Sequence, residues 1–95
     1  MIASFANDTT ADLFNGRNTK AARKVPKDLW RIAARKLSTL DYAKDLRDLA
    51  TPGNSLEKLK GILNGKYSIR INDRFRIVFN FDRGDASNVV ITDCH

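Results

Sequence analysis

The sequence has one cysteine, one histidine and no long apolar run, and each shortage excludes a class of protein. Cys94 has no second cysteine to pair with, which excludes an intramolecular disulfide and a zinc site built from several cysteines. His95 would need scattered carboxylates beside it to bind a metal, so neither a metal nor a cofactor is expected. No stretch approaches the ~18 apolar residues of a membrane span, and no signal peptide is recognisable. We therefore expect a reduced, cytoplasmic setting without membrane contact.

Positive charge is in excess and unevenly distributed. Seventeen Lys and Arg against eleven Asp and Glu give a formal net charge of +6 over 95 residues, a length that predicts a single domain spanning 1–95. Between Arg17 and Lys36 there are eight basic residues and one acidic residue. Between Glu57 and Arg76 there are six basic and two acidic residues. Two concentrated basic blocks are typical of a protein that binds nucleic acid or an acidic protein partner.

Three short strands are predicted in the last third of the chain, with arginines on one face and aromatic residues on the other. A three-residue loop, 72–74, keeps the apolar residues of the first two strands on one face. This register places Arg70 opposite Arg76, at a cost of about a few tenths of a kcal/mol for like charges. Either the two side chains splay apart in solvent, or an anion such as a phosphate lies between them. The other opposed pairs are Ile71 with Phe75, Ile69 with Ile77, and Tyr67 with Phe79.

Helices are predicted in the first half of the chain. A main helix follows Pro26, which suits a first helical turn, and its apolar stripe is Trp30, Ala33, Leu37 and Leu40. Shorter helical pieces are expected around 8–14 and at 41–49, and residues 1–5 form either an edge strand or an unpaired lead-in. The order of elements predicts an α+β fold, a small antiparallel sheet of about four strands with two or three helices packed on one face. A basic ridge on the main helix consists of Lys27, Arg31 and Arg35.

These residues suit cleavage of a phosphodiester without a metal, because RNA supplies its own nucleophile, the 2′-OH. The protein then has to position the backbone, transfer protons and stabilise charge on the phosphate. Arg70, Arg76 and Lys60 are candidates for stabilising that charge. His95 has the side chain best suited to proton transfer near neutral pH, and Asp93 either orients it or acts as the base. The alternative is that His95 is a frayed terminal residue without a role.

Four segments together resemble the HigB toxins of the RelE superfamily: 1–5, Pro52–Gly61, Tyr67–Ile77 and Asp93–His95. The resemblance implies a RelE-like fold and a toxin of a type II toxin–antitoxin system. It implies an mRNA interferase, a ribosome-dependent endoribonuclease that enters the A site, cuts mRNA without a metal and so inhibits translation. It also implies a HigA-type helix-turn-helix antitoxin as partner, with operator DNA contacted only through that antitoxin.

The resemblance also implies roles for single residues. Arg76 matches the arginine expected to hold the scissile phosphate, and Lys60 matches the lysine of a Leu-Lys-Gly step. Asp93 and His95 match the ends of a terminal Asp-Tyr-His signature. Affinity for RNA is expected from further basic residues through release of counterions from phosphates. These are Arg70, Arg74, Lys58 and Lys66, together with the basic ridge.

The sequence departs from the family pattern at two positions. Cys94 stands in place of the tyrosine of the signature, which removes a surface for base stacking and a phenol. Glu57 stands where some relatives have a histidine, and it is either a base or an ordinary surface residue. Two alternatives therefore stay open: a catalytically impaired protein that binds RNA or the ribosome or acts as an antitoxin-dependent operon corepressor, and a basic adaptor that uses the Arg17–Lys36 block against an acidic protein segment.

Overall fold

A computed structural model of the chain describes residues 1–61 and 65–93. Within these residues it contains α-helices, short 3-10 helices and a four-stranded sheet, which confirms the predicted α+β class. The helices in chain order are α1 (Asp8–Phe14), η1 (Ala22–Lys24), η2 (Lys27–Leu29), α2 (Trp30–Tyr42) and η3 (Leu46–Leu49). The strands are β1 (Glu57–Lys58), β2 (Lys66–Arg70), β3 (Phe75–Asp82) and β4 (Asp85–Asp93).

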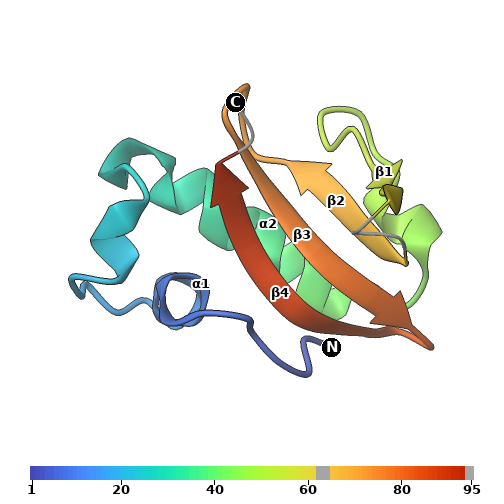
Figure 1. Cartoon of the computed structure of the whole chain (residues 1–95), viewed down its shortest axis with the longest axis horizontal. Helices are drawn as coiled ribbons and strands as arrows, with labels where there is room; N and C mark the ends of the chain where they lie inside the picture. Colours follow the sequence, from blue (N-terminus) through green and yellow to red (C-terminus); the bar gives the residue numbers. More distant parts are fainter. Residues whose placement is uncertain (62–64, 94–95) are drawn as a thin grey trace.

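The strands form one antiparallel sheet in the order β1-β2-β3-β4, so each strand pairs with its neighbour along the chain (Figure 1). The loop between β2 and β3, residues 71–74, is closed by Asn72, whose Oδ1 accepts the N–H groups of Arg74 at 3.0 Å and Phe75 at 2.7 Å. An asparagine side chain that bonds the backbone two residues on is a common way to close such a turn. The predicted register is confirmed, with Tyr67 opposite Phe79, Ile69 opposite Ile77 and Arg70 opposite Arg76.

The edges of the sheet differ from the sequence-based expectation. Strand β1 was not predicted, because two residues are too short to show an alternating pattern. At the other edge, residues 1–5 run beside β4 without forming a strand. Ile2 and Phe5 make isolated parallel bridges with Ala86 and Val89. The lead-in thereby covers part of the hydrogen-bonding edge that β4 would otherwise expose.

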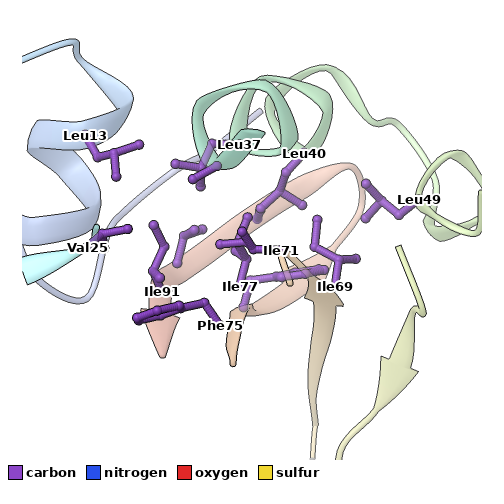
Figure 2. Packing of buried hydrophobic residues seen from close by; sticks show 14 of the residues in the cluster. Leu13, Val25, Leu37, Leu40, Leu49, Ile69, Ile71, Phe75, Ile77 and Ile91 are labelled. Atoms are coloured by element: carbon purple, nitrogen blue, oxygen red, sulfur yellow. The ribbon is translucent and has the colours of Figure 1, made fainter. Parts of the chain in front are cut away.

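Both α-helices pack on the same face of the sheet, with α2 behind the strands and α1 beside β4 (Figure 1). Figure 2 shows side chains of Leu37 and Leu40 from α2 facing Ile69 and Ile77 of the sheet. All four of these side chains have no exposed area. The alternating apolar residues of the strands and the i, i+3, i+7 stripe of α2 therefore form one core, and the helices leave the opposite face of the sheet to a groove.

The helix boundaries differ from the prediction at both ends of α2. Pro26 precedes the short helix η2 instead of lying in the first turn of α2, which begins at Trp30. The Trp30 indole N–H donates to the Val25 carbonyl at 2.8 Å, so this half-buried residue is anchored by its ring nitrogen as well as by packing. The predicted helical piece at 41–49 is wrong. Its first two residues extend α2 to Tyr42, and only 46–49 form the separate helix η3.

A bulge in β4 shifts its pairing with β3. Val78 pairs with Val90 and Asn80 with Ser87, so β4 has one residue more than β3 between these two pairs. The additional residue is accommodated by Asn88, whose φ of +52° lies in the left-handed region. Because of the bulge, both Ala86 and Val89 face the core although they are an odd number of residues apart. No helix within residues 1–61 and 65–93 is long and apolar enough to cross a membrane.

Candidate functional site

A groove of about 510 Å³ lies on the face of the sheet that the helices leave uncovered. Its floor is formed by strand residues that alternate with the core residues, such as Ser68, Arg76 and Val90. Its described lining residues are Ala6, Glu57, Leu59, Lys66, Ser68, Arg76, Val78, Asn88, Val90, Thr92 and Asp93. Among the predicted site residues, Arg76, Asp93 and Lys66 therefore share one groove. The described lining does not include Arg70, Arg74, Lys58 or Lys60.

Arg76 lies on this floor and is held by three neighbours. Its Nε donates to Ser68 Oγ across the strand pair at 2.9 Å, and one terminal nitrogen donates to the Ser55 carbonyl at 2.7 Å. The same nitrogen lies 3.9 Å from Glu57 Oε1. The Arg76 side chain is 18% exposed, so its orientation is set by the protein while part of it remains accessible. A guanidinium fixed in this way is prepared to receive a phosphate without losing rotamer freedom on binding.

Arg70 and Arg76 face each other across β2 and β3, but they have different partners. Arg70 forms an ion pair with Asp73 of the hairpin loop, whereas Arg76 is bonded to Ser68 and Ser55. The Asp73 carboxylate thus offsets part of the repulsion that the register creates. Each guanidinium thus has a partner from the protein, and the anion expected between the two stays a prediction.

Lys36 of α2 belongs to the same region, and sequence reasoning missed it. Its ammonium donates to the Gly53 carbonyl at 3.0 Å and to the Arg70 carbonyl. Burial lowers the pKa of Lys36, and Arg70, Arg35 and Arg76 lower it further by repulsion. The signal in the sequence was the spacing of Lys36, three residues after Ala33 and four before Leu40, which are both core residues of α2. A charged residue on that side of a helix needs a partner.

Asp93 lies at the end of β4, where it pairs with Phe75 of β3 in the ladder. Arg74 Nε donates to Asp93 Oδ2 at 2.8 Å, and this ion pair fixes the carboxylate at one end of the groove. His95, the predicted partner of Asp93, lies outside the described residues, as does Cys94. Glu57 and Asp93 are thus the carboxylates that line the groove within the described part of the chain.

The predicted lysines lie at different places around β1 and β2. Lys66 lines the groove, and its Nζ donates to Asn80 Oδ1 at 3.0 Å. Lys58 is exposed on β1, and Lys60 is exposed just beyond that strand. Among residues 1–61 and 65–93, no three Asp, Glu, His or Cys side chains gather as ligands of a metal ion would.

Residues 3–95 match the model of the HigB-like toxins, described as RelE-like toxins of the type II toxin–antitoxin system HigB. The chain belongs to the HigB-like toxin family. It is 38% identical over 73 residues to Toxin HigB-1 of Vibrio cholerae serotype O1, a match that covers 76% of this chain and 77% of that protein. It is 32% identical over 69 residues to an uncharacterized protein of Haemophilus influenzae, covering 72% and 68% of the two chains.

Solved structures with the same fold include chains of a toxin–antitoxin complex. In a YoeB–YefM complex from Staphylococcus aureus, the similar chain has a TM-score of 0.62 and 19% identity, with 100% of this chain and 98% of that chain covered. A chain of the S. aureus YoeB dimer has a TM-score of 0.59 and 20% identity, with 99% and 94% covered. The RelE-like fold expected from the sequence is thereby confirmed. The chain is a toxin of a type II toxin–antitoxin system of the RelE/HigB kind.

Proposed function

We propose that this toxin is a ribosome-dependent endoribonuclease that enters the A site and cuts mRNA, with the RNA 2′-OH as nucleophile and no metal. The observation that carries the proposal is the fixed guanidinium of Arg76 on the floor of the groove, with Glu57 3.9 Å from it. A cation held in place beside a carboxylate supplies the two elements that cleavage of RNA requires, charge stabilisation and proton transfer.

The proposed reaction is an internal transfer of the phosphoryl group. The 2′-oxygen forms a bond to the adjacent phosphorus while the bond from phosphorus to the 5′-oxygen breaks, giving a 2′,3′-cyclic phosphate and a 5′-OH. A base takes the 2′ proton, an acid returns one to the 5′-oxygen, and Arg76 stabilises the negative charge on the phosphate, assisted by Arg70 and Lys60. We assign the base to Glu57, because it is the groove carboxylate beside Arg76. Asp93, with His95, is proposed for the proton on the 5′-oxygen.

Binding to the ribosome is proposed to rest on the exposed basic residues around the groove and on η2 and α2. Lys58, Lys60 and the ridge of Lys27, Arg31 and Arg35 are exposed, Lys66 lines the groove, and Arg74 is paired with the groove residue Asp93. Each contact of a lysine or arginine with a ribosomal RNA phosphate releases counterions, so affinity should fall steeply with salt. Such a toxin would act in the cytoplasm, where ribosomes are found.

An antitoxin is the second proposed partner. The S. aureus structures of similar fold include a heterotetrameric complex of a toxin with its antitoxin. Together with membership of the HigB-like family, this supports an antitoxin for the present chain, and the resemblance favours a HigA-type helix-turn-helix protein. Operator DNA would then be contacted through that antitoxin.

The direct test compares Arg76→Ala with Arg47→Ala on ribosomes programmed with mRNA. Arg47 is an exposed arginine outside both basic blocks, so the two variants lose the same charge. Arg76→Ala should lower the rate of mRNA cleavage by about 10²–10³-fold, the usual cost of a donor to a charged transition state. Co-sedimentation with ribosomes should remain nearly unchanged, because many other cations contribute to it.

Three outcomes separate the proposal from its rivals. Equal loss of cleavage and of ribosome binding in Arg76→Ala would contradict the assigned role. A wild-type protein that sediments with ribosomes and yields no 2′,3′-cyclic phosphate ends would be a binder that does not cut. Failure to sediment with ribosomes would favour a basic adaptor instead.

A further inference from the structure

Lys36 joins three elements that are far apart in the sequence. It projects from α2, and its ammonium donates to Gly53 in the turn after η3 at 3.0 Å and to the carbonyl of Arg70 at the end of β2. Each of these carbonyls belongs to a segment that contacts Arg76. Arg70 is its cross-strand neighbour, and the turn leads directly to Ser55, whose carbonyl accepts from Arg76 at 2.7 Å.

The turn at 51–55 needs such anchoring because its backbone is unusual. Ser55 has a φ of +46°, in the left-handed region that a side chain with a Cβ rarely adopts. Asn54, 6% exposed, fixes the turn from within, since its Nδ2 donates to the Leu49 carbonyl at 3.0 Å and its own carbonyl accepts the Arg70 N–H at 2.6 Å. Lys36 fixes the preceding residue, Gly53. The Ser55 carbonyl is therefore directed at Arg76 by bonds on its amino-terminal side to α2 and β2.

Lys36 occupies this place against electrostatic repulsion. Burial and the guanidinium groups of Arg70, Arg35 and Arg76 all disfavour its charged form. Its two carbonyl acceptors offset this cost, because a lysine ammonium carries three donors on a long chain and can reach both of them. A neutral side chain of the same length would avoid the repulsion but would leave the two carbonyls without this donor.

We propose that Lys36 is a positioning residue for Arg76, acting through the turn at 53–55 and the end of β2. The inference deepens the proposed nuclease function and rests on it for its effect on rate. Lys36 does not contact the reacting atoms. It holds the Ser55 carbonyl, and with it the Arg76 guanidinium, where a scissile phosphate is received.

The test uses Lys36→Met, which removes the donors but keeps the length, and Lys44→Met as a matched control. Lys44 is an exposed lysine outside both basic blocks, so its replacement removes the same charge. Lys36→Met should lower kcat for ribosome-bound mRNA by up to about 10²-fold, because an error of about 1 Å in position has that cost. KM for programmed ribosomes should change little, and Lys44→Met should match the wild type.

A second readout follows Arg76 without any RNA. The Arg76 Nε–H, bonded to Ser68, should give a slowly exchanging NMR signal in the wild type and in Lys44→Met, and a shifted, faster exchanging one in Lys36→Met. Lys36→Arg keeps both donors and charge and should restore the signal and most of kcat. Where Lys36→Met does not fold, Lys36→Gln, which keeps a donor and loses the charge, takes its place in both measurements.

The two proposals fail in different ways. An unchanged Arg76 signal and unchanged kcat in Lys36→Met, with cleavage lost in Arg76→Ala, would overturn the positioning role alone. A disturbed Arg76 signal in Lys36→Met, with cleavage intact in Arg76→Ala, would overturn the nuclease assignment and leave the positioning contact established. A fall in thermal stability with unchanged kcat per folded molecule would show that Lys36 only stabilises the fold.

Discussion

The two faces of the sheet are built on different principles. On the covered face, Ile77 and Phe79 have no exposed area. Their contribution to stability depends on the volume they fill and on their place in the apolar pattern, because apolar packing has no required direction. On the open face, Arg76 depends on particular atoms, Ser68 Oγ and the Ser55 carbonyl, at defined distances. The comparison teaches that one strand can carry stability on one side and a preorganised site on the other, so the two should respond to different mutations.

The largest expected effect contrasts neighbouring residues of β3. Phe79→Ala should lower the free energy of unfolding by about 3–5 kcal/mol, because it removes a buried ring from the core. Val78, the preceding residue, points to the groove, and Val78→Ala should cost less, about 1–2 kcal/mol for fewer lost methyl contacts. Denaturant unfolding monitored by Trp30 fluorescence measures both. Equal losses would contradict the division between the faces.

The next effect lies entirely on the open face. Glu57→Gln should lower the rate of mRNA cleavage by about 10²-fold, the contribution of a general base, because its carboxylate is the one beside Arg76. Stability should change by less than about 1 kcal/mol, since the Glu57 side chain is 60% exposed. Asp93→Asn is the matched variant, a second groove carboxylate that is paired with Arg74. A Glu57→Gln variant that cuts mRNA at the wild-type rate would contradict the assignment of the base to Glu57.

The same difference between the faces explains how much could be predicted from the sequence. The hairpin register followed from alternation alone, because a shift by one residue would have moved every apolar side chain to the open face. The core stripe of α2 followed from helical spacing for the same reason. Strand β1 was missed because two residues are too few to show an alternating pattern. Its pairing with β2 depends on the tertiary fold, which the local sequence does not reveal.

For the candidate site, the sequence predicted side chains that share the groove but not the groups that hold them. Arg76, Asp93 and Lys66 were predicted and share the groove. The Ser55 carbonyl and the ammonium of Lys36 were not predicted, because a backbone acceptor has no sequence signature and its direction depends on how a turn packs against a helix. Directional contacts between segments distant in the sequence are thus the features of the candidate site that could be found only in the structure.

A smaller effect on stability is expected from the loop that links β2 and β3. Asp73→Asn removes the partner of Arg70 and leaves it opposite Arg76 without its counter-ion. Because Asp73 is 97% exposed, the loss in unfolding free energy should be about a few tenths of a kcal/mol and should shrink at high salt. Unfolding at low and high ionic strength measures it. In an Arg70→Gln background the substitution should have no effect, and a persistent loss there would point to the turn backbone instead.

The smallest expected effect is a dependence of stability on pH that belongs to Lys36. Its pKa in the folded protein is lowered by burial and by Arg70, Arg35 and Arg76, while the unfolded chain regains the ordinary value of 10.5. Between the lowered pKa and 10.5 the unfolded state binds more protons, so the free energy of unfolding should rise with pH in that window. Subtracting the values for Lys36→Met at each pH removes the contributions of all other titrating groups. A difference that is flat, or that falls with pH, would mean that the two carbonyl bonds outweigh burial and repulsion, and that the ammonium is favoured at this junction between the core helix and the open face.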